Sequence, residues 1–146
     1  MNQKQLLKNI YLFNGATPDD LDAVSGIAEP KVYVVGDFVY HEGDVADALY
    51  VVETGSIDLL PVGKEAVFTT IGGGQAFGEL AFFEHGKRPA SASARELTHV
   101  LRIPYDKLSK LLAARPGLAL LFYRNTCTFF TKHFRRIAVG LDHRYL

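Results

Sequence analysis

Apolar positions near the N-terminus recur at helical spacing. The opening segment is marked by four such residues, Leu6, Leu7, Ile10 and Leu12. A second helix is predicted from Pro18 to about Ala28, because Thr17 is a good N-cap and proline followed by acids suits a first turn. This helix ends before Pro30, since the residue that precedes a proline is pushed out of the helical region.

Beyond residue 30 the pattern changes to short runs rich in β-branched and aromatic residues. The runs are 31–35, 38–40, 48–52, 56–60 and 66–71, and glycine-containing turns lie between them. Strands this short, about ten residues apart with no helices between them, predict an antiparallel β-roll of jelly-roll type over about residues 30–104. Residues 78–88 interrupt the rhythm, which resumes at 90–95 and 99–103. A simple hairpin does not explain that interruption.

The C-terminal part returns to a helical period, with one helix predicted over 105–115 and a long one over about 116–141. The long helix carries apolar residues at alternating spacings of three and four: Leu120, Tyr123, Cys127, Phe130, Phe134, Ile137 and Leu141. We call this set the heptad stripe. It packs either on the chain's own β-roll or on the same stripe of a second copy, and the two alternatives can hold on different halves of the helix. The fold class is therefore mainly β with flanking helices.

Composition narrows the functional classes. The chain has 146 residues, 48% of them apolar and 22% charged, which is the size and composition of a single globular domain, 1–146. Sixteen basic residues balance sixteen acidic ones, so an anion must be held locally rather than by an overall basic field. One cysteine, Cys127, excludes an internal disulfide and a cysteine-ligated zinc site. With no apolar run of about 20 residues, we expect a cytoplasmic protein without a membrane segment.

The interrupting segment carries the chemistry. It begins with Gly78-Glu79-Leu80-Ala81 and ends with Arg88-Pro89-Ala90. Glycine permits close backbone approach, a short helical turn after it offers free N–H groups, and arginine presents a planar donor fork suited to phosphate. Glu79 would repel a phosphate, but its carboxylate is a good acceptor for a ribose hydroxyl. Phosphate and sugar together predict a nucleotide ligand.

These residues resemble the phosphate-binding cassette of the cyclic nucleotide-binding domain family, which includes catabolite activator proteins and protein kinase A regulatory subunits. Glycine-punctuated strands upstream, at 35–39, 42–44, 47–52 and 55–57, are similar to the same family, so the resemblance spans about residues 5–138. It implies that Glu79 accepts from the ribose 2′-hydroxyl and that Arg88 clamps the cyclic phosphate. Backbone N–H groups around Gly78, Leu80 and Ala81 would complete the anion site, beside Pro89 and Ala90.

The resemblance also implies where the base lies. Leu59, Phe68 and Thr69 fall where the roll faces the base, and the last helix would cover it near His133 or Phe134. If the base touches that helix only in the bound state, binding pulls the helix onto the roll and produces a signal.

One departure from the family pattern bears on which nucleotide binds. The residue after the arginine, usually threonine or serine in members that read guanine, is Pro89 here, which has neither a hydroxyl nor a backbone N–H. Cyclic AMP is therefore favoured over cyclic GMP, although Ser91 would replace the missing hydroxyl if the strand began later. The expected function is a cyclic nucleotide sensor that acts on an unknown protein effector, with no other cofactor.

Other functions were weighed against this one. Glu79 and Arg88 could instead form an internal ion pair in a domain that has lost its ligand and serves as a dimerising interaction module. His41, His85 and His99 lack the spacing of a metal site, and no nucleophile and base are arranged for catalysis, so neither a metal nor an enzyme is expected.

Nucleic-acid binding is also not expected. The basic residues of the last helix, Lys132, His133, Arg135, Arg136 and Arg144, are typical of a solvated face. With the chain ending at Leu146 and no helix-turn-helix after that helix, we expect a stand-alone sensor that makes no direct contact with nucleic acid.

Overall fold

The computed structural model describes residues 2–61, 67 and 69–145, the last six of these by backbone alone. The helical segments are α1 (Gln3–Lys8), η1 (Tyr11–Phe13), α2 (Pro18–Ile27), α3 (Leu80–Glu84), α4 (Tyr105–Ala114) and α5 (Pro116–Tyr145). The strands are β1 (Glu29–Tyr33), β2 (Phe38–Tyr40), β3 (Ala48–Thr54), β4 (Ser56–Pro61), β5 (Thr69–Gly72), β6 (Ala76–Phe77), β7 (Ala90–Ala94) and β8 (Thr98–Pro104).

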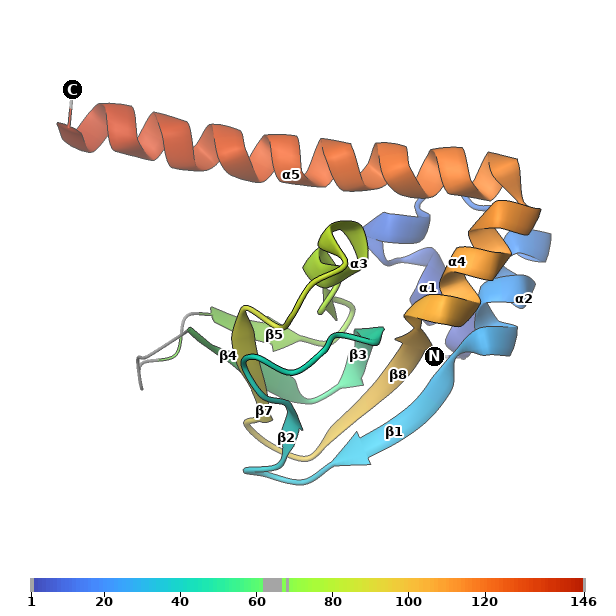
Figure 1. Ribbon diagram of the computed structural model, residues 1–146, viewed down its shortest axis with the longest axis horizontal. Coiled ribbons are helices and arrows are strands. Elements are labelled where there is room, and N and C mark those ends of the chain that lie inside the picture. Colours follow the sequence, from blue (N-terminus) through green and yellow to red (C-terminus); the bar gives the residue numbers. More distant parts are fainter. Residues whose placement is uncertain (1, 62–66, 68, 146) are drawn as a thin grey trace.

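The strands form two antiparallel sheets that face each other, which confirms the β-roll (Figure 1). The strand orders are β1-β8-β3-β6 and β2-β7-β4-β5. Strand β7 shows why the sequence folds this way: its alanines alternate with serines, and Ala92 and Ala94 are buried between the sheets while Ser91 and Ser93 are less buried. Val52, Ile57 and Phe77 complete this core.

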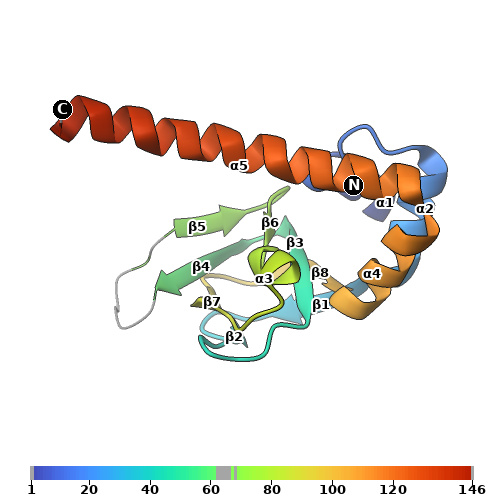
Figure 2. The same ribbon diagram turned by 45° about the horizontal axis from the view of Figure 1, so that its top comes forward.

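A second core joins the helices to the outer face of one sheet. Helices α1, α2 and α4 gather at one end of the roll, beneath the start of α5 (Figures 1 and 2). Leu7, Phe13, Leu108 and Phe122 are fully buried there with Leu101 of β8. Thr17 caps α2 as predicted, since its hydroxyl accepts from the Asp20 N–H and the Asp20 carboxylate accepts from the Thr17 N–H.

Helix α5 uses a different face for packing than the heptad stripe. Leu118, Phe122 and Thr126 are the buried residues of this helix, whereas the side chains of Leu120 and Ile137 are 62% and 61% exposed. Tyr123, Cys127 and Phe134 are exposed as well, and Phe130 is half-buried. Most of the stripe is therefore not packed on the chain's own roll, because the helix presents a second apolar face at four-residue spacing. Its first half touches the rest of the chain, where the Tyr123 ring lies edge-on to Phe83 of α3. The Leu141 side chain lies outside the described residues.

The first strand begins earlier than the sequence predicts. Strand β1 starts at Glu29 and includes Pro30, which is accommodated because β1 lies at the edge of its sheet and pairs with β8 alone. The interruption at 78–88 contains the short helix α3. The strand predicted over 66–71 is described only from Thr69 onward, as β5. Within the described ranges, no helix has the length and apolar character needed to cross a bilayer.

Candidate functional site

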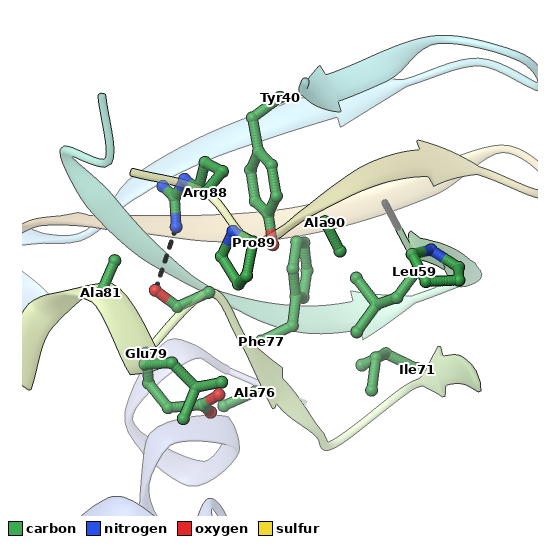
Figure 3. Close-up of a pocket in the computed structure, with 13 residues that line it drawn as sticks. Tyr40, Leu59, Ile71, Ala76, Phe77, Glu79, Ala81, Arg88, Pro89 and Ala90 are labelled. Carbon is green, nitrogen blue, oxygen red and sulfur yellow. Dashed lines mark hydrogen bonds between the residues drawn. The ribbon is translucent and has the colours of Figure 1, made fainter. Parts of the chain in front are cut away.

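A cavity of about 330 Å³ opens between the strands of the roll and the turn that precedes α3 (Figure 3). Its wall contains all seven residues of the predicted phosphate and ribose site, Gly78, Glu79, Leu80, Ala81, Arg88, Pro89 and Ala90. The remaining lining residues are Tyr40, Leu59, Pro61, Ile71, Ala76 and Phe77. Two segments that are separated by α3 in the sequence thus meet at one pocket.

Arg88 is the buried cation of the pocket, with 3% of its surface exposed. One terminal nitrogen donates to the Gly78 carbonyl at 3.1 Å and the other to the Ala48 carbonyl at 2.6 Å. The Tyr40 ring lies 4.0 Å from the guanidinium carbon, a favourable cation–π distance. The Nε atom is buried and has no hydrogen-bond partner among the residues that the structure describes. The Nε–H is therefore a buried donor of the guanidinium that the described part of the protein does not use.

The backbone of Arg88 is fixed by the turn that follows β2. The Gly43 N–H donates to the Arg88 carbonyl at 2.9 Å, and the Arg88 N–H donates to the Asp44 carbonyl at 2.8 Å. The sequence identifies residues 42–44 only as one of the glycine-punctuated segments that resemble the family. The structure shows that this turn holds the cation of the pocket in place.

Gly78 has a left-handed backbone conformation, with φ of +78°, which glycine adopts without strain. A Cβ at this position would lie 2.9 Å from an Arg88 terminal nitrogen, so any larger residue would have to displace the guanidinium. The Gly78 carbonyl also accepts from the Tyr105 hydroxyl. Burial raises the pKa of Tyr105 to about 12, although Arg88 opposes the shift, so the phenol stays protonated and keeps donating.

Glu79 points away from Arg88, toward the N-terminal helices (Figure 3). Its Oε2 lies 3.4 Å from the Tyr11 hydroxyl, which donates to it. Burial raises the pKa of the Glu79 carboxyl to about 7, against the lowering effect of its own backbone N–H and of Tyr11. Among the ion pairs of the described residues, Arg88 meets only Asp47, at 3.9 Å. The internal Glu79–Arg88 ion pair weighed as an alternative is therefore absent from the described chain.

The residues predicted around the base are not gathered at one place. Leu59 lines the pocket, whereas Thr69 and His133 border a neighbouring hollow that shares Ile71 and Ala76 with it. Phe134 is 72% exposed and lines neither space in the part of the chain that the structure describes. Phe68 lies outside the described residues. The base contacts of all five residues stay predictions.

The sequence model of the cyclic nucleotide-binding domain family matches residues 30–115, which include both sheets and the whole pocket wall. This chain belongs to the cyclic nucleotide-binding domain family. The match to the family model begins just after α2 and extends through α4.

Relatives of this family resemble the chain over most of its length. The cyclic AMP receptor protein of Thermus thermophilus is 28% identical over 139 residues, which are 93% of this chain and 62% of that protein. The crystal structure of the Thermus thermophilus catabolite activator protein superimposes with a TM-score of 0.77 at 28% identity, over 90% of this chain and 62% of the other. The chain thus spans less than two thirds of the length of these relatives.

A third similarity is to a structure that contains the nucleotide. The regulatory domain of Toxoplasma gondii PKA, crystallised with cAMP, has a TM-score of 0.70 and 27% identity, over 75% of this chain and 42% of that one. Similarity to bacterial and protozoan members alike shows that the family fold extends beyond the cassette.

The sequence alone did not predict several residues that line the pocket or contact its wall. Tyr40 could have been found from its place in the apolar run 38–40, but nothing in the sequence joins Tyr11 to Glu79, 68 positions away. The alternative donor Ser91 is placed outside the pocket wall, where its hydroxyl accepts from the Glu42 N–H at 2.9 Å. Since β7 begins at Ala90, the later strand start that would have brought Ser91 to the ligand is wrong.

Proposed function

We propose that this chain is a cytoplasmic cyclic nucleotide sensor that binds cyclic AMP in the pocket beside α3 and takes part in signal transduction through α5. The observation that carries the proposal is the meeting of Gly78–Ala81 and Arg88–Ala90 in one wall. The cyclic AMP named for the Thermus and Toxoplasma relatives supports the same ligand. No catalytic step is part of the proposal.

The anion end of the pocket is suited to a cyclic phosphate. Arg88 brings a permanent positive charge to a largely apolar wall, where charge-assisted hydrogen bonds are strong. A buried donor without a partner costs about 1–3 kcal/mol. A phosphate oxygen that reached the Arg88 Nε would remove that cost and so favour binding.

Pro89 supports cyclic AMP over cyclic GMP. It lines the pocket directly after Arg88 but offers neither a hydroxyl nor an N–H to a guanine. The nearest hydroxyl along the chain, that of Ser91, lies outside the pocket wall and accepts from the Glu42 N–H. The discrimination expected from one missing hydrogen bond is about fivefold to tenfold in affinity.

Relay through α5 requires that the helix take different positions with and without ligand. His133 and Thr69 border the hollow next to the pocket, so a small movement of α5 would bring His133 toward the base. The exposed face of α5 is then available to a protein effector. We propose that binding changes the position of this helix.

Calorimetric titration of refolded protein with cyclic AMP and with cyclic GMP tests the ligand. Refolding removes nucleotide carried over from expression. We expect binding of both, with cyclic AMP the tighter. The variant Arg88→Lys keeps the charge but loses the planar guanidinium. We expect its affinity for cyclic AMP to be about 100-fold lower. The exposed Arg95→Lys serves as the control. The proposal fails if the unmodified protein binds neither nucleotide, or if the two variants lose affinity equally.

The exposed heptad stripe favours a second function, self-association of two copies through α5. Leu120, Tyr123, Phe134 and Ile137 are large apolar side chains left open on one face of the helix. In a parallel in-register pair, Cys127 would face the partner's Cys127, so mild oxidation would join the copies covalently.

Sedimentation analysis tests the self-association. Phe130→Glu is expected to give monomers, whereas Thr128→Glu, exposed on another face of α5, should leave dimers intact. If the dimer persists in Phe130→Glu, the stripe is not the interface. If dimers form while no nucleotide binds, the chain is an interaction module instead of a sensor.

A further inference from the structure

One contact joins the pocket to the N-terminal segment. The hydroxyl of Tyr11, in η1, donates to Oε2 of Glu79, in the turn before α3. Both side chains are half-buried, and burial together with the nearby carboxylate raises the pKa of Tyr11. The phenol therefore stays protonated at physiological pH and acts as a donor.

The ring of the same tyrosine is fixed to α5. It stacks on Phe129, with ring centroids 3.9 Å apart and planes 14° from parallel. Nearby, the Asn125 side-chain amide donates to the Leu12 carbonyl at 3.1 Å and to the Asn14 carbonyl at 2.9 Å. Segment η1 is thus fastened to α5 by a ring stack and by two hydrogen bonds from one side chain.

Glu79 retains acceptor capacity beyond Tyr11. A carboxylate has two oxygens and about four lone-pair directions, and the Tyr11 hydroxyl engages one of them. A ribose hydroxyl can therefore be received without displacing the phenol. The phenol restricts the rotation of the carboxylate and favours its ionised form, which is the better acceptor.

We propose that Tyr11 is a positioning residue that orients Glu79 for the ribose 2′-hydroxyl and ties that contact to the placement of α5. This inference rests on the proposed nucleotide binding. It adds a residue outside the phosphate cassette and outside the stretch that matches the family model, which begins at residue 30. Movement of α5 away from the roll would shift η1, withdraw the phenol and weaken the hold on the ribose.

The test compares cyclic AMP with 2′-deoxy cyclic AMP by calorimetry. Tyr11→Phe keeps the ring on Phe129 and removes only the hydroxyl. We expect its affinity for cyclic AMP to fall about tenfold, while its affinity for the deoxy ligand stays unchanged, since that ligand makes no contact through the 2′ position. Tyr33→Phe, on β1, is the matched control and should alter neither affinity.

A second variant examines the link to the helix. Phe129→Leu leaves the Tyr11 hydroxyl in place and removes the stacked ring. We expect this variant, like Tyr11→Phe, to bind cyclic AMP with a smaller preference over 2′-deoxy cyclic AMP than the unmodified protein. Equal losses for both ligands in Tyr11→Phe would show a general structural role and overturn the proposal. An unchanged preference in Phe129→Leu would overturn the tie to α5. If the unmodified protein binds neither ligand, the inference and the proposed function both fail.

Discussion

The two ends of the pocket differ in how complete they are in the free protein. At the anion end, Arg88 is buried, held by two backbone carbonyls and covered by the Tyr40 ring. At the opposite end, Leu59 and Ile71 offer partly exposed apolar surface, and α5 contributes no residue to the wall among those described. The comparison teaches that the guanidinium proposed to bind the phosphate is already fixed in the free protein, whereas the contacts proposed for the base require α5 to move.

The largest effect is expected from disturbing the prebuilt end. Gly78→Ala places a Cβ 2.9 Å from an Arg88 terminal nitrogen in a backbone conformation that alanine disfavours. Displacement of the guanidinium should lower the affinity for cyclic AMP about 100-fold, as measured by calorimetry. Gly86→Ala is the control, since a Cβ there meets nothing within 4 Å. Equal behaviour of the two variants would show that the anion end is not preformed.

The second-largest effect is a change of about 2 kcal/mol in the free energy of unfolding with pH, which we expect from the titration of Glu79. Its folded pKa of about 7 exceeds the ordinary value of 4.5, so the folded state retains the proton over this interval. Stability therefore falls as pH rises from about 5 to 7 and then levels off. In Glu79→Gln this loss is absent.

Urea unfolding at pH 5.5 and 8.5 measures that difference. The free energy of unfolding of the unmodified protein should fall by about 2 kcal/mol relative to Glu79→Gln between the two values. Glu84→Gln, at an exposed position on α3, should follow the unmodified protein. A parallel course for all three proteins would mean that burial does not shift the pKa of the Glu79 carboxyl.

A smaller effect is expected on the ratio of the affinities for cyclic AMP and cyclic GMP. Pro89→Thr adds a hydroxyl and an N–H at the pocket wall, so the affinity for cyclic GMP relative to cyclic AMP should rise about tenfold. Pro89→Ala restores the N–H alone and separates the two contributions. The argument from Pro89 fails if the ratio of the two affinities is the same in both variants and in the unmodified protein.

The smallest effect is expected at the apolar end. Leu59→Ala removes half-buried apolar surface that contributes about 1 kcal/mol to binding. The affinities for both nucleotides should therefore fall about fivefold, and the ratio of the two affinities should stay the same. Calorimetry with both ligands measures the change, and the exposed Leu97→Ala serves as the control. A loss as large as that of Gly78→Ala would contradict the difference between the two ends.

Much of the fold follows from local signals. The alternation in 90–94, the cap at Thr17 and the helical period after residue 104 each specify an element through a few neighbouring side chains. The residues of the phosphate cassette could also be predicted from the sequence, because Gly78, Glu79 and Arg88 are residue types suited to binding a phosphate and a sugar. The heptad stripe shows the limit of such signals, since its spacing predicts a helix face without specifying what packs against that face.

The sequence by itself determined the β-roll, its flanking helices and the residues of the phosphate cassette, because these depend on short-range periodicity, turn chemistry and side-chain type. Only the tertiary structure decided which groups surround that cassette: the carbonyl of Ala48 on Arg88, the ring of Tyr40 above it and the phenol of Tyr11 on Glu79. These contacts join residues 40 to 68 positions apart. They arise from the way two sheets and an N-terminal segment close around one turn, which no local pattern encodes.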